Sequence, residues 1–188
     1  QAIPSPGQFY AYFTGAELLG TTLDIYRTEE AFAKDVIKAY VEFVNEIYEA
    51  GCRNLQFDDC VWGGMVNPKL AVALTGRKGQ KLEDYKALLL QLNNEVVAQA
   101  PSDLVINTHV CRGNYHSTFF SSGAYDGVAD LLFGEENVNA YYLEYDDERS
   151  GGFAPLAKVS GDKKVVLGLV TTKSPVLEDK EAVIARIR

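Results

Sequence analysis

The sequence has few of the residues that usually mark a local metal or disulfide motif. Its 188 residues include 3 cysteines and 2 histidines, and none of the cysteines forms a Cys-x-x-Cys pair. An odd and sparse set of cysteines does not support a disulfide framework in a chain of this length, so we expect reduced thiols. Any metal site must therefore be assembled across the fold from separate segments.

Other features are also missing, and each argues against a class of protein. The net charge is -8, whereas binding to a nucleic-acid backbone requires clustered lysine and arginine. No apolar run approaches the roughly 20 residues of a membrane-spanning helix, and the first residues lack the basic and apolar parts of a signal peptide. We therefore expect a soluble, cytoplasmic protein that binds neither nucleic acid nor membranes.

What the sequence does contain is an alternation of apolar runs and helical repeats. Hydrophobic residues make up 47% of the chain, enough for a substantial core. After a strand end at 2–7 and an aromatic, irregular segment at 8–23, we expect strands near 54–59, 104–107, 138–143 and 164–170, and helices near 28–51, 81–100, 125–133, 153–157 and 179–188. Strands that are almost continuously apolar predict a parallel sheet covered by helices.

Polar residues gather at the C-terminal ends of these strands, as they do in a (β/α)8 barrel. No Gly-x-Gly-x-x-Gly follows a strand, and residues 76–81 lack the spacing of a phosphate loop, which argues against a nucleotide-binding sheet. The expected fold is therefore α/β, of the parallel (β/α)8 TIM-barrel type. Because five βα units are too few to close a barrel, we interpret residues 1–188 as a single partial barrel domain.

Two metal-ligand types lie two positions apart at the end of one predicted strand. His109 and Cys111 follow the apolar run 104–107, so their side chains should leave the same face about 6.6 Å apart along the strand. Glu144 ends the next strand, which in a parallel sheet reaches the same edge. Nitrogen, sulfur and oxygen donors from adjacent strand ends predict a zinc-type metal site.

The chain also resembles the catalytic barrel of cobalamin-independent methionine synthase, most closely its short, single-barrel relatives. The resemblance covers 55–188 and depends on four segments, which read Leu55-Gln56-Phe57-Asp58, Thr108-His109-Val110-Cys111, Leu143-Glu144 and Gly168-Leu169-Val170-Thr171-Thr172-Lys173-Ser174-Pro175. It implies zinc bound by His109, Cys111 and Glu144, and Asp58 bound to the amino group of homocysteine. It also places the first strands before Gln1, and the last strand with a fourth cysteine ligand after Arg188.

The reaction that this resemblance implies is methyl transfer from 5-methyltetrahydrofolate or a related donor to the thiol of homocysteine or a similar thiol. Zinc would keep that thiol as a thiolate at neutral pH. The departing nitrogen of the donor needs a proton. The family has a histidine before Ser-Pro for this step, and Lys173 stands at that position here.

Three alternatives remain open at this stage. Cys60 could supply a ligand from its own strand end, although no required spacing supports it. The chain could belong to the decarboxylase branch of the same barrel superfamily, which acts on porphyrins without metal. It could also be a non-catalytic protein that binds zinc or a thiol.

From spacing alone, Asp58 and Asp59 could equally be a helix cap or a solvated loop.

Overall fold

The computed structural model describes residues 1–188 and contains a five-stranded, all-parallel sheet. The strands are β1 (Ala2–Pro4), β2 (Asn54–Asp58), β3 (Val105–Val110), β4 (Ala140–Glu144) and β5 (Lys164–Gly168), and they lie side by side in that order. The predicted α/β fold with a parallel sheet is confirmed. Each strand pairs with the next strand along the chain, with no reversal of the kind that defines a doubly wound sheet. This arrangement is consistent with a partial barrel.

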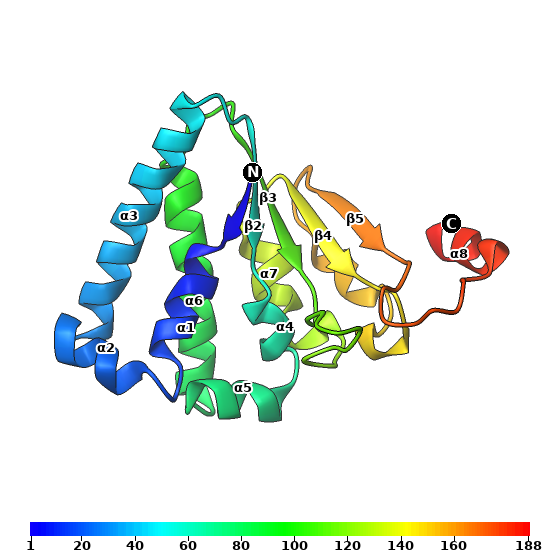
Figure 1. Cartoon of the computed structure of the whole chain (residues 1–188), viewed down its shortest axis with the longest axis horizontal. Helices are drawn as coiled ribbons and strands as arrows, with labels where there is room; N and C mark the ends of the chain where they lie inside the picture. The colour runs from blue at the N-terminus through cyan, green and yellow to red at the C-terminus, as the bar shows by residue number, and fades with distance from the viewer.

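The helices that connect the strands pack together beside the sheet, whereas the C-terminal helix lies apart from them beyond β5 (Figure 1). The two longest, α3 (Glu29–Glu49) and α6 (Gln80–Ala98), agree with the predicted helices near 28–51 and 81–100. The remaining helical segments are α1 (Pro6–Thr14), α2 (Leu19–Tyr26), α4 (Val61–Met65), α5 (Pro68–Thr75), η1 (Tyr125–Gly127), α7 (Ala129–Glu135), η2 (Glu148–Ser150), η3 (Ala154–Lys158) and α8 (Lys180–Ile187). None of these helices is both long and apolar enough to cross a membrane.

The segment 8–23, which we expected to be irregular, is instead largely helical. Helix α1 begins because the Ser5 side chain accepts a hydrogen bond from the backbone N–H of Gln8, and Pro6 takes the first helical position. Proline is well suited to that position, because a helix leaves its first N–H groups unpaired. The prediction was wrong because it treated Pro4 and Pro6 only as residues that interrupt helices.

The two faces of the sheet differ. Toward the helices, alternate strand residues enter a continuous cluster of 32 buried apolar residues, among them Leu55, Phe57, Ile106, Tyr141 and Leu143. The other face is open along much of its length, and Tyr142 and Val166 are 37% and 41% exposed there. Because side chains alternate between faces, His109 lies on this open face, opposite Asp58 on β2 and Tyr142 on β4.

Candidate metal centre

The predicted site residues come together at the carboxyl edge of the sheet. Asp58 is the last residue of β2 and pairs with His109 of β3, while Glu144 ends β4. Since His109 pairs with Tyr142, Cys111 lies level with Glu144. The parallel register therefore places Asp58 and His109 at one level of the sheet, and Cys111 and Glu144 at the next level toward its carboxyl edge.

His109 is bonded to the carboxylate beside it. The distance from its Nδ1 atom to Oδ1 of Asp58 is 2.6 Å, and the two side chains are 34% and 54% exposed. This hydrogen bond is the main reason that the pKa of His109 rises to about 10, and it lowers the pKa of Asp58 in turn. Asp58 thus fixes the orientation of the imidazole and favours its protonated form.

Cys60 brings a second thiol to the same place. It lies two residues after the end of β2, and its Sγ atom lies 3.2 Å from Sγ of Cys111 and 3.8 Å from Nδ1 of His109. The hydrogen bond from Cys60, with a further one involving His109, lowers the pKa of Cys111 to about 5. The same contact raises the pKa of Cys60. At neutral pH, Cys111 is therefore a thiolate beside an imidazolium and a neutral thiol.

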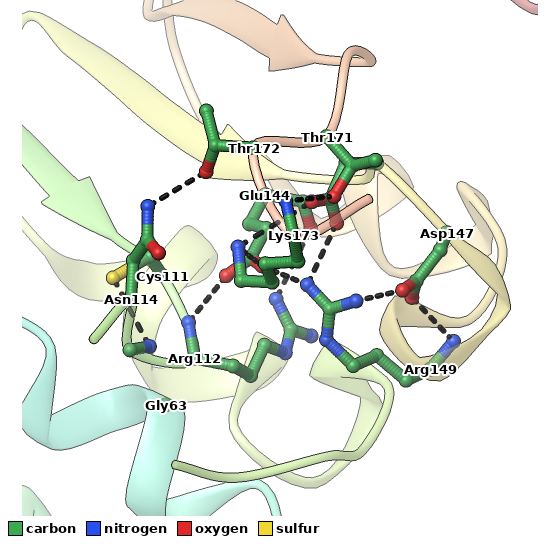
Figure 2. Close-up of polar contacts among 12 residues, drawn as sticks. Gly63, Cys111, Arg112, Asn114, Glu144, Asp147, Arg149, Thr171, Thr172 and Lys173 are labelled. Carbon is green, nitrogen blue, oxygen red and sulfur yellow. Dashed lines mark hydrogen bonds and ion pairs between the residues drawn. The ribbon is translucent and has the colours of Figure 1, made fainter. Parts of the chain in front are cut away.

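Glu144 lies at the same edge but turns toward positive charge (Figure 2). Its Oε1 atom is 2.8 Å from Nζ of Lys173 and also pairs with Arg149, while the backbone N–H of Arg112 donates to Oε2. The Nζ atom of Lys173 also lies 3.5 Å from Oδ2 of Asp146. Both carboxylate oxygens of Glu144 are thus engaged, and the side chain is only 8% exposed.

Arg112 stabilises this arrangement through buried hydrogen bonds. Its side chain is almost fully buried, where its guanidinium donates to the carbonyl oxygens of Gly123 and Glu144 and lies 3.9 Å from the centre of the Tyr125 ring. A buried guanidinium that satisfies its donors in this way fixes the loop after β3 to the end of β4. No spacing of residues in the sequence indicates this role.

Asp59 anchors the segment that carries Asp58 and Cys60. It is fully buried and accepts hydrogen bonds from Ser5 at 2.6 Å, Trp62 at 3.0 Å and Asn93 at 2.6 Å. Burial nevertheless raises the pKa of Asp59 to about 6. Of the two neighbouring carboxylates, Asp59 is therefore structural and Asp58 faces the site.

Two cavities open at this edge. One, of about 350 Å³, is lined by four predicted site residues, namely His109, Cys111, Glu144 and Lys173. The other, of about 590 Å³, is lined mainly by hydrophobic residues, with Cys60 and residues of α1, α4 and α5 among its lining. Cys60 therefore lies where the larger cavity approaches the histidine and cysteine.

The structure brings together His109 and Cys111 as predicted, but it adds Cys60 and leaves Glu144 out of their cluster. One donor atom from each of Cys60, His109 and Cys111 lies within 4.8 Å of the others. Two sulfurs and an imidazole nitrogen are donors that zinc accepts, so these residues fit the metal that the sequence predicted. The sequence left Cys60 open as an alternative ligand because of its place at a strand end, and that place is the signal that points to it.

Comparisons with known proteins identify relatives of this chain. No family model matches the chain. Two uncharacterized proteins of Bacillus subtilis (strain 168), YxjH and YxjG, are 38% and 37% identical to it over 98% of its length. A solved structure from Listeria monocytogenes, provisionally assigned as a vitamin-B12-independent methionine synthase, matches the whole chain with a TM-score of 0.69 and 32% identity. The chain spans 48% of each Bacillus protein and 50% of the Listeria protein, about half the length of its relatives.

Proposed function

We propose that this chain is the metal-holding part of a zinc-dependent methyltransferase. In this proposal a methyl group passes from 5-methyltetrahydrofolate or a related donor to the thiol of homocysteine or a similar thiol. The observation that carries it is the cluster of His109, Cys111 and Cys60 at the carboxyl edge of a parallel sheet. The name given to the Listeria neighbour supports an enzyme of this kind.

His109 and Cys111 would hold the metal. When bound, the metal would keep an acceptor thiol deprotonated near neutral pH. Cys111 is suited to bind the metal, because its pKa of about 5 makes it a thiolate at neutral pH before any metal binds. Asp58 orients the His109 ring through the 2.6 Å hydrogen bond. Ligands held in place before the metal arrives lose less freedom on binding it.

Asp58 also suits the second role that the sequence suggested. Its side chain is 54% exposed and its pKa is lowered, so it offers a carboxylate to solvent at the edge of the site. An ammonium group of an amino-acid thiol would be attracted to that charge. Asp58 could then serve both His109 and the substrate, because a carboxylate has two oxygens and several acceptor positions.

Lys173 is the proposed proton donor to the departing nitrogen. It lines the cavity that His109 and Cys111 also line, and its ammonium is held by Glu144 and Asp146. A cation fixed at this place can donate a hydrogen bond to a leaving group that gains negative charge. The larger cavity, about 590 Å³ and mostly apolar, is of a size suited to a methyl donor with a planar ring system.

The test combines metal content with methyl transfer in the longest natural form of the protein. After dialysis against a mild chelator, elemental analysis should find one zinc per wild-type chain and little zinc in Cys111→Ser. Methyl transfer to homocysteine should be lost in the same variant, while Cys52→Ser, a cysteine remote from the site, should retain both properties. Transfer that persists in Cys111→Ser would refute the proposal. Zinc without turnover in the wild type would favour the alternative of a non-catalytic protein that binds zinc or a thiol. The absence of both zinc and transfer in the wild type would favour the metal-free decarboxylase.

A further inference from the structure

The larger of the two cavities has aromatic side chains in its lining that remain open to solvent. Its volume is about 590 Å³, and α1, α4, α5 and the loop that follows β3 all border it. Tyr12 of α1 and Phe120 of that loop both line the cavity, and they are 66% and 63% exposed. Exposed aromatic side chains that meet at one cavity indicate a surface that a ligand covers.

The loop that carries Phe120 is firmly held. The backbone N–H groups of Phe120 and Ser121 donate to the carbonyl oxygen of Arg112 at 2.7 and 3.0 Å, and the Ser121 hydroxyl donates to the carbonyl oxygen of Gly63 in α4. Gly113 has a φ of +89°, and a Cβ atom there would lie 2.8 Å from Cβ of Phe120, so only glycine allows this close packing. The backbone that carries the Phe120 ring is therefore fixed before a ligand binds, which lowers the entropy lost on binding.

The charges in the lining determine which ligands suit the cavity. Only Glu17 and Arg112 among the lining residues carry a charge at neutral pH. Arg112 is 1% exposed, and its guanidinium donates to the carbonyl oxygens of Gly123 and Glu144, so it is not available to an anion. A carboxylate in this cavity would lose hydration without gaining a cationic partner, and the exposed Glu17 would repel it.

We propose that this cavity binds a flat, uncharged ring against Tyr12 and Phe120, and that Glu17 selects against a ligand with an acidic tail. This inference rests on the proposed function, because it names the class of methyl donor, a neutral ring that carries the methyl group. Aromatic faces recognise such a ring by offset stacking, which requires no charge on the ligand. Cys60 lines the same cavity, and its sulfur is 3.2 Å from Sγ of Cys111, so a ring bound here lies next to the thiols.

Two ligands that share one ring separate the effect of the ring from that of the tail. 5-Methyltetrahydrofolate carries a glutamate tail, and 5,6-dimethyltetrahydropterin has none. In calorimetric titrations of the longest natural form, the wild type should bind the pterin at least as tightly as the folate. Phe120→Ala should weaken pterin binding about 10-fold, whereas Tyr115→Ala, a control in the same loop but outside the cavity lining, should not. Glu17→Lys should tighten folate binding about 5-fold and leave pterin binding unchanged, because it replaces a repulsion by an attraction.

A wild type that does not bind the pterin would overturn the proposal, as would a Phe120→Ala variant that binds it like the wild type. A folate affinity that is the same in Glu17→Lys and in the wild type would contradict the role of Glu17. Phe120→Leu, which keeps an apolar side chain but removes the stacking face, replaces Phe120→Ala should that variant not fold. These titrations require neither zinc nor turnover. Ligand binding as expected without methyl transfer would therefore refute only the proposed function, and methyl transfer with the wrong ligand preference would refute only this inference.

Discussion

Replacing Asp59 by asparagine tests the assignment of this residue as a buried structural acid. The substitution keeps the shape of the side chain and retains an oxygen that can accept from Trp62 and Asn93. Its amide group must then face Ser5, whose hydroxyl loses its acceptor. Asparagine cannot ionise, so the variant removes the only charge that this buried cluster would gain when Asp59 loses its proton.

The magnitude follows from the pKa of Asp59, which burial raises from 3.8 to about 6. A group whose pKa is higher in the folded state binds its proton more tightly when folded, so folding becomes less favourable as pH rises from 3.8 to 6. At 1.36 kcal/mol for each pKa unit, ionisation of Asp59 costs the folded state about 3 kcal/mol above pH 6. Most of that cost should develop between pH 4 and pH 7.

The assay is urea unfolding of metal-free wild type and Asp59→Asn at a series of pH values from 4 to 7. His109 and Cys111 also titrate differently on folding, but both are present in the two proteins, so their effects cancel in the difference. The buried Glu136 does not cancel, because the charge of Asp59 contributes to its raised pKa, and removing that charge favours the variant in the same direction. We expect the variant to gain about 2 to 3 kcal/mol relative to the wild type across this range. A difference in unfolding free energy that stays constant from pH 4 to pH 7 would refute the assignment.

Two further substitutions probe the packing and the electrostatics of the site. Gly63→Ala should lower the unfolding free energy by about 1 to 3 kcal/mol and weaken metal binding, because its methyl group overlaps the carbonyl oxygen of Cys111; Gly20→Ala, with no atom near the added methyl, should not destabilise the chain in the same urea titration. Asp58→Asn should lower the pKa of His109 from about 10 toward its ordinary value, since the hydrogen bond that His109 donates to Asp58 is the main cause of the rise. An NMR titration of the metal-free variant measures this directly, and an unchanged His109 pKa would mean that another group holds the proton.

The sheet and its functional edge could be predicted because both follow from local patterns. Apolar runs such as 104–107 and 138–143 identify buried strands, and parallel strands put residues such as His109 and Glu144 at a common edge. The helical nature of 8–23 was missed, since its start depends on how Ser5 and Pro6 cap a helix and not on apolar periodicity. Patterns of this kind do not identify the partners of each side chain.

Those partners explain why the ligand set was harder to predict than the fold. Cys60 reaches Cys111 because α4 begins at Val61 and folds back against β3, and Glu144 is occupied because Arg149 and Lys173 approach it from two different loops. Neither arrangement has a fixed sequence spacing. The ligand role of Glu144 remains a prediction, as do the substrate role of Asp58 and the catalytic role of Lys173.

Charge compensation makes this edge suitable for an anionic reactant even though the whole chain carries a net charge of -8. Glu144 and Asp146 would repel a thiolate if they were free, but Lys173 and Arg149 pair with both of them. His109 and Cys111 line the other side of the same cavity, where under the proposed function a divalent ion would offset the thiolate charge of Cys111. The cavity is thus divided into a half where charge is balanced by fixed ion pairs and a half where a metal would balance it. Under the proposed function, a thiol that loses its proton beside His109 and Cys111 would meet no uncompensated negative charge from the opposite wall.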